Sequence, residues 1–139
     1  MTEKIFITVE VSIKANVQKV WQCWTLPEHI VRWYFASDDW HAPKAENDLR
    51  AGGSFLTRME SKDGTMGFDF TGIYDEVNTE SFITYTITGG RKVKILFSAV
   101  SHETHVSQIF EAEDINEIEL QRGGWQAILE NFKKYVESN

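Results

Sequence analysis

Apolar and polar residues alternate with a period of two in two parts of the chain. Near the start, Ile5, Ile7, Val9, Val11 and Ile13 alternate with residues that suit a solvent face, which predicts a strand over residues 5–13. The alternation returns after Gly52-Gly53 and predicts strands near 54–61, 66–77, 81–88, 92–100 and 104–112. Asp63-Gly64 is the strongest hairpin signal between them. The pattern therefore predicts an antiparallel meander and, with the first strand, a sheet of about six strands.

A different period marks the last stretch, residues 116–138. Its apolar residues recur at i, i+3, i+4, i+7 and i+11, which predicts a long amphipathic helix; they are Trp125, Ile128, Leu129, Phe132 and Val136. Asp114 with Glu117 predicts a capping box at its start. Such a helix is on the order of 30 Å long, so it needs a wide apolar surface, which the sheet supplies.

Two short helices are predicted after the first strand. Asn16 caps the first, which ends before Pro27 because the residue preceding a proline is disfavoured in a helix. The second begins at Pro27 and carries Ile30, Val31, Trp33 and Tyr34. Residues 35–48 show no period and predict a long loop, which in compact domains often serves binding or acts as a lid. Helices before and after a meander indicate the α+β class.

The alternation also predicts which strand residues face inward: Phe55, Thr57, Met59, Phe68, Phe70, Gly72, Tyr74, Val93, Ile95, Phe97 and Ala99. Gly72 in mid-strand indicates a close backbone approach or room left open. Gly123-Gly124, inside the predicted helix, indicates a kink or a tight contact between helix and sheet, or else an opening beside Trp125.

Length and charge narrow the function classes. A chain of 139 residues is expected to form one domain, residues 1–139, with its own core. The net charge of −7, without a basic cluster, argues against nucleic acid and anionic membranes as partners. The N-terminus lacks the apolar region of a signal peptide and no stretch is apolar enough to insert into a membrane, so we expect a cytoplasmic protein. Cys23 is the only cysteine and is expected to be a buried thiol.

Few residues suggest chemistry. The chain has neither a nucleophile elbow nor a phosphate-binding loop, and we expect no cofactor. His102 and His105 have a spacing that metal sites use, but they lie at a predicted hairpin tip and no cysteine accompanies them, so a surface pair is favoured over a metal site. Asp38, His41 and Tyr74 are the acid–base candidates for an enzyme, which is the less favoured class.

A set of spaced motifs resembles a known family. The motifs are Val20-Trp21, Trp24-Thr25-x-Pro27-Glu28, Trp33, Asp48-Leu49-Arg50-x-Gly52-Gly53-x-Phe55, Met59, Asp63-Gly64, Gly72-x-Tyr74-x-Glu76-Val77, Thr104 and Gly124-Trp125. They resemble the small bacterial proteins similar to the C-terminal domain of the activator of the ninety-kilodalton heat-shock chaperone's ATPase, in the START-like (SRPBCC) superfamily. The resemblance implies a helix-grip fold, in which a curved antiparallel sheet surrounds one long C-terminal helix. It also implies an apolar cavity between sheet and helix, or an accessory role toward other proteins.

These observations lead to two functional hypotheses. In the first, a small apolar molecule binds between sheet and helix, and the candidate ligand-binding residues are Trp33, Tyr34, Trp40, Phe55, Phe70, Tyr74, Phe97, Gln108, Trp125, Leu129 and Phe132. Gln108 is the inward polar group expected to orient the ligand. In the second, the aromatic residues only fill the core and the protein is a chaperone accessory or another protein-interaction module. The sequence leaves open whether the protein is a monomer or a homodimer.

Overall fold

A computed structural model describes residues 4–139 of the protein. Residues 1–3, part of the segment in which we expect no signal peptide, lie outside the described residues. Three helices are present: α1 (Val17–Thr25), α2 (Pro27–Ile30) and α3 (Ile118–Glu137). The strands are β1 (Phe6–Ile13), β2 (Trp40–Asn47), β3 (Ser54–Ser61), β4 (Gly67–Asn78), β5 (Phe82–Ile87), β6 (Lys92–Val100) and β7 (Glu103–Glu111).

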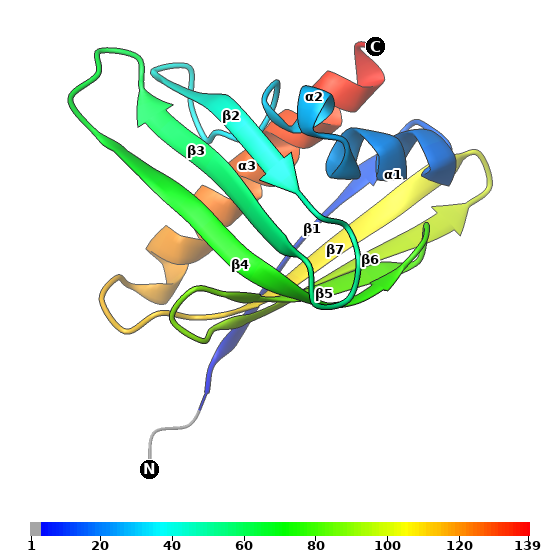
Figure 1. The fold of residues 1–139 in the computed structure, drawn as a ribbon. Helices are drawn as coiled ribbons and strands as arrows, with labels where there is room; N and C mark the ends of the chain where they lie inside the picture. Colours follow the sequence, from blue (N-terminus) through cyan, green and yellow to red (C-terminus); the bar gives the residue numbers. More distant parts are fainter. Residues whose placement is uncertain (1–3) are drawn as a thin grey trace.

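One antiparallel sheet holds all seven of these strands in the order β1-β7-β6-β5-β4-β3-β2. The sheet curls around α3, while α1 and α2 lie over one end of it (Figure 1). The core between these layers contains the alternate residues of β1, β6 and β7 together with Leu129, Phe132 and Val136 of α3. The predicted α+β class and the helix-grip arrangement are confirmed.

Strand β2 corrects the predicted loop over residues 35–48 and raises the strand count from about six to seven. Two features hide this strand from a period-two pattern. The pairing of β2 with β3 shifts register between His41 and Lys44, and Pro43 lies at that shift. A proline is tolerated there because β2 is an edge strand and one row of its backbone groups needs no partner. The connection that remains between α2 and β2 is short.

The start of α3 differs from the predicted capping box. The N-cap residue is Glu117, its side chain makes no capping hydrogen bond, and Asp114 lies outside the helix. Gln121 ties down the preceding segment instead. Its side chain accepts a hydrogen bond from the Glu113 backbone N–H and donates to the carbonyls of Glu113 and Asn116. The capping prediction was wrong: Asp114 is not the N-cap residue, and the segment before α3 is held by a side chain from within the helix.

The short helices follow the prediction more closely. The Asn16 side chain accepts a hydrogen bond from the Lys19 N–H at 2.9 Å, and α1 ends before Pro27. Helix α2 ends at Ile30, earlier than predicted, so Trp33 and Tyr34 lie in the turn after it. The Trp33 indole N–H donates to the carbonyl of Cys23 at 2.9 Å and fixes this turn against α1.

The inward faces of the strands agree with the alternation except near strand ends. Val93, Ile95 and Phe97 are buried, but Ala99 is exposed because it lies at the end of β6. Phe68 is on the predicted face yet is 47% exposed. A Cβ added to Gly72 would lie 2.5 Å from the carbonyl oxygen of Thr86. The close backbone approach predicted at Gly72 is therefore confirmed.

Helix α3 also shields the free edge of β1. The Arg122 guanidinium donates to the carbonyl of Thr8 at 3.1 Å, and the Gln126 amide donates to the carbonyl of Glu10 at 3.2 Å. An unpaired strand edge can recruit a further strand, so these side chains protect β1 from unwanted pairing. They also fix α3 laterally over the sheet, which sets the space left on its other side.

Candidate functional site

A cleft of about 420 Å³ lies between α3 and the half of the sheet that contains β3 and β4. Helix α3, strands β2, β3, β4 and β7, and the segment after α2 all contribute to its walls. Small-molecule sites typically occupy ~300–1,000 Å³, so this cleft is within their range. Its lining residues are Trp24, Tyr34, Phe35, Ala36, Ser37, Trp40, Met59, Phe68, Phe70, Arg91, Gln108, Glu113, Gly124, Trp125 and Ile128.

Seven of the fifteen residues that line the cleft are aromatic. Trp125 of α3 stacks on Phe110 of β7, with ring centres 3.8 Å apart and planes 7° from parallel. The Phe70 ring meets Trp125 edge to face at 6.4 Å. Trp40 and Phe68 form a second pair at 6.2 Å. Because Phe110 is fully buried beneath Trp125, the indole of Trp125 is a supported wall of the cleft.

Gln108 is the buried polar residue of the cleft, with 4% of its surface exposed. It pairs with Val9 on one neighbouring strand and with Ile95 on the other, so it lies in a row of core residues. Its amide interacts with the Tyr85 hydroxyl. A glutamine amide has two donor hydrogens and an oxygen with two lone pairs, so capacity remains for a ligand.

Charged residues are found at one end of the cleft. Arg91, in the turn between β5 and β6, and Glu113, after β7, both line it. They also line a smaller depression beside it, together with Leu120, Gly124 and Trp125. The cleft is thus apolar along most of its length and polar at this end.

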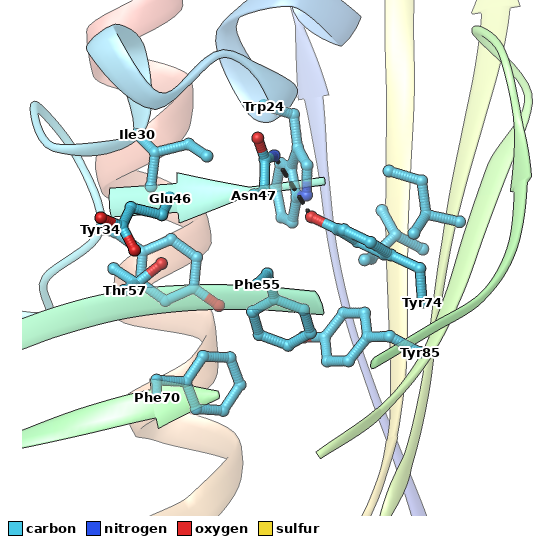
Figure 2. A pocket seen from close by; sticks show the side chains of 12 residues that line it. Trp24, Ile30, Tyr34, Glu46, Asn47, Phe55, Thr57, Phe70, Tyr74 and Tyr85 are labelled. Carbon is cyan, nitrogen blue, oxygen red and sulfur yellow. Dashed lines mark hydrogen bonds between the residues drawn. The ribbon is translucent and has the colours of Figure 1, made fainter. Parts of the chain in front are cut away.

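A separate inner space lies deeper, near α1 and the middle of the sheet (Figure 2). Its volume of about 30 Å³ has room for a water molecule or so and no ligand. Asn47 donates to the Thr25 carbonyl at 2.8 Å and to the Tyr74 hydroxyl at 3.3 Å. Burial raises the pKa of Tyr34, Tyr74 and Tyr85, so these hydroxyls stay protonated and act as fixed hydrogen-bonding groups.

The structure divides the predicted ligand-binding residues into three groups. The residues that line the cleft are Tyr34, Trp40, Phe70, Gln108 and Trp125. Phe55 and Tyr74 line the small inner space. Trp33, Phe97, Leu129 and Phe132 are core residues with at most 5% of their surface exposed, and they line neither space.

The three aromatic residues of the core group pack around Trp24. The ring centres of Trp24 and Phe132 are 4.8 Å apart, those of Trp33 and Phe132 are 4.5 Å apart, and Phe97 meets Trp24 edge to face at 6.0 Å. Aromatic pairs in this geometry stabilise a core beyond their buried area. This cluster closes the end of the sheet beneath α1.

Several lining residues were not among the predicted ligand-binding residues. Phe35, Ala36 and Ser37 belong to the segment predicted as a binding or lid loop, which was a signal for them, whereas Arg91 and Glu113 are charged residues in connections and had no such signal. For three other lining residues the sequence did give a signal. Met59 and Phe68 were predicted to face inward, and Ile128 was predicted to lie on the apolar stripe of the helix.

Gly124 was noted for a possible opening beside Trp125. A Cβ added to Gly123 or to Gly124 would meet no atom within 4 Å. This excludes a tight contact between helix and sheet at these glycines, which was one of the predicted alternatives beside a kink and an opening. Gly124 lines the cleft directly, so its missing side chain leaves space there.

The three residues considered for acid–base catalysis lie in different surroundings and are not brought together in one site. His41 Nε2 lies 3.4 Å from the Glu60 carboxylate, Tyr74 accepts from Asn47, and Asp38 lines a depression on the other side of the segment after α2. Among residues 4–139, no group of three His, Cys, Asp or Glu side chains is placed to hold a metal ion. Cys23 is a buried free thiol, and burial raises its pKa.

The two histidines predicted to form a surface pair lie in different local surroundings. His105 lies 3.2 Å from the Ser12 hydroxyl and 3.4 Å from the Glu10 carboxylate, across the β1–β7 pair. His102 is exposed in the turn before β7. No helix in the described part of the chain is long and apolar enough to cross a membrane.

Comparison with known proteins places the chain in a family. An NMR structure of an AHSA1-like protein from Aeromonas hydrophila is 39% identical and superimposes with a TM-score of 0.92, covering 96% of this chain and 93% of that one. A solution structure from Cytophaga hutchinsonii is 52% identical, with a TM-score of 0.82 and coverage of 96% and 92%. A crystal structure from Nitrosomonas europaea, at 19% identity, TM-score 0.83 and coverage of 96% and 95%, shares the fold.

No curated protein matches the sequence significantly. The family model described as Activator of Hsp90 ATPase homolog 1-like protein matches residues 14–137, almost the whole length of the chain. This agrees with the resemblance carried by the sequence motifs. The chain belongs to the family of Activator of Hsp90 ATPase homolog 1-like proteins.

Proposed function

We propose that this protein binds a small, mostly apolar molecule in the cleft between α3 and strands β3 and β4. The observation that carries the proposal is a cleft of about 420 Å³ with seven aromatic residues among its fifteen lining residues and one buried amide, that of Gln108. Binding sites for small molecules usually have this composition, with apolar walls for affinity and few polar groups for orientation.

The separation of cleft and core supports the proposal. Trp33 packs against Phe132, Phe97 packs against Trp24, and Trp33, Phe97 and Phe132 line neither space, so these core contacts do not depend on filling the cleft. Trp125 of α3 and Trp40 of β2 both line the cleft. An apolar molecule that contacts such rings would bury apolar area, at ~25 cal/mol per Å² removed from water.

A thermal-shift screen with fatty acids, sterols and aromatic compounds tests the proposal. A compound at a hundred times its dissociation constant stabilises the native state by about 2.7 kcal/mol, which raises the melting temperature by roughly 10 °C for this chain length. The shift is expected to fall in Trp40→Ala and to persist in Val100→Ala, a control at an exposed site outside the cleft. The proposal fails if no compound gives a shift, or if both variants respond like the parent.

A second candidate function is contact with a partner protein, which exposed apolar side chains favour. Met66, Ile115 and Leu120 are 63%, 89% and 64% exposed, and exposed apolar residues mark contact surfaces where they form a contiguous patch. The family description suggests an ATPase of the Hsp90 class as the partner. Steady-state ATPase assays of a purified chaperone of that class, with and without this protein, test the idea. Unchanged turnover together with no binding by calorimetry would count against it.

A further inference from the structure

The charged end of the cleft indicates which kind of ligand it accepts. Arg91 lines the cleft there, and Gln108 lines it further along the sheet. Arg91 directly precedes β6, in which Ile95 pairs with Gln108. The two side chains are therefore attached four residues apart along the sheet, roughly 13 Å at ~3.3 Å per residue. The stacked pair Phe110 and Trp125 lies between them, because Phe110 pairs with Val93.

The backbone and the guanidinium of Arg91 are both held in place. Its carbonyl accepts a hydrogen bond from the Ile87 N–H at 2.8 Å, across a turn in which Gly89 and Gly90 have φ near +110°. Its Nη1 donates to the carbonyl of Glu111 at 3.3 Å. A guanidinium has five N–H donors, so most of them remain available. The side chain is thus positioned with donors to spare.

The nearby carboxylates have other partners. Glu111 accepts from the backbone N–H of Lys92 at 3.2 Å and lies 4.0 Å from the Lys4 ammonium. Glu113 accepts hydrogen bonds from both the backbone and the side chain of Asn116. Within residues 4–139, no carboxylate oxygen lies within 4.0 Å of the Arg91 guanidinium. Its positive charge is therefore not neutralised by a direct ion pair.

We propose that the ligand is amphipathic, with an oxyanion of the carboxylate or sulfonate type bound by Arg91 and an apolar body lying along Trp125 toward the Gln108 amide. This inference rests on the proposed function and specifies the ligand class. Two oxygens of a carboxylate or a sulfonate match the fork of guanidinium donors, and such charged hydrogen bonds are stronger than neutral ones. The net charge of −7 does not oppose it strongly, because charges more than ~10 Å away are screened at ordinary salt.

Two fluorescent probes with the same ring system test this inference. Anilinonaphthalenesulfonate carries a sulfonate, and phenylnaphthylamine has the same rings without it. Both are titrated into the full-length protein. The parent is expected to bind the sulfonate probe about ten- to a hundredfold more tightly, as one charged hydrogen-bonded contact implies. Arg91→Met is expected to remove that preference and to leave the affinity for the neutral probe within about twofold.

Three further variants complete the test. Arg91→Lys retains the charge and is expected to keep part of the preference, and Glu113→Gln is expected to increase it by removing a negative charge from the same end of the cleft. Arg32→Met removes an exposed charge that lines no cleft and is expected to change nothing. If Arg91→Met does not fold, two other measurements test the inference. The parent's preference for the sulfonate probe is expected to disappear at high salt, and Arg91→Lys is expected to retain part of that preference at low salt.

The outcomes separate the two proposals. If neither probe binds the parent, the cleft is not a ligand site and the proposed function fails. If the neutral probe binds as tightly as the sulfonate probe, the cleft binds apolar molecules but the oxyanion inference is overturned. It is also overturned if Arg91→Met weakens both probes equally, since Arg91 would then only support the structure.

Discussion

The two adjacent glycines of α3 allow the packing of the helix and the role of the cleft to be tested together. A glycine inside a helix costs about 1 kcal/mol relative to alanine, and an added Cβ would meet no atom within 4 Å at Gly123 or at Gly124. Gly123→Ala and Gly124→Ala are each expected to stabilise the protein by about 1 kcal/mol, which raises the melting temperature by roughly 3–5 °C. Differential scanning calorimetry measures both.

Of the two glycines, only Gly124 lines the cleft. A side chain larger than alanine is therefore expected to affect ligand binding at position 124 and not at position 123. Leucine is also a good helix former, and Gly124→Leu places a branched side chain beside Trp125. We expect Gly124→Leu to be at least as stable as the parent and to bind phenylnaphthylamine at least tenfold more weakly. The matched control Gly123→Leu is expected to bind normally. A loss of stability in Gly124→Ala would show that the space beside the helix is occupied, and normal probe binding by Gly124→Leu would show that the probe binds elsewhere.

Four other predictions concern single side chains. The Thr84 hydroxyl is buried without a hydrogen-bond partner among the described residues, so Thr84→Val is expected to stabilise the protein by about 1 kcal/mol in urea unfolding. Hydrogen bonds from neighbouring side chains and backbone lower the pKa of Asp63 to about 2, below the unfolded value of about 3.9. The stability this carboxylate contributes is present above pH ~4 and is lost as the pH falls to ~2, so Asp63→Asn should lose less stability over that range; an equal loss would contradict this. Phe132→Ala is expected to cost about 3–5 kcal/mol, because the side chain is fully buried, and Trp40→Ala less than half as much, both by urea unfolding. The Asn131 amide donates to two backbone carbonyls after α2, so Asn131→Ala should cost about 1–2 kcal/mol and increase hydrogen exchange there; unchanged exchange would contradict it.

The fold was predictable because its signals are local and repeated. The strand boundaries near Asp63-Gly64 and the capping of α1 by Asn16 depend on a few neighbouring residues, and the structure confirms both. Strand β2 was missed because its pairing shifts register near Pro43, so the alternation changes phase within the strand. The capping box failed for a related reason, since Gln121 bonds the segment before α3 from a position that no capping motif includes.

The division between core and cleft could not be predicted from periodicity. Trp33 and Tyr34 are neighbours in the same turn, yet Trp33 is fully buried among rings and Tyr34 reaches the cleft. Phe132 and Trp125 lie on the same stripe of α3, two turns apart, and differ in the same way. Alternation and helical period predict which side of an element faces inward. They do not predict where sheet and helix lie too far apart for their side chains to fill the space between them. That distance depends on the curl of the sheet relative to α3.

Gly72 and Gly124 are glycines in opposite surroundings, one crowded and one open. At Gly72 an added Cβ would lie 2.5 Å from the Thr86 carbonyl oxygen and 2.7 Å from the Phe55 ring, so glycine permits close packing there and a substitution would strain the sheet. At Gly124 the same atom would meet nothing, so the missing side chain costs helix stability and gains no contact. Gly123 has the same open surroundings, but only Gly124 lines the cleft, so the space that Gly124 leaves is part of the cleft beside Trp125. Helix α3 therefore both completes the core, through Leu129 and Phe132, and lines the cleft near its first turns, through Gly124 and Trp125.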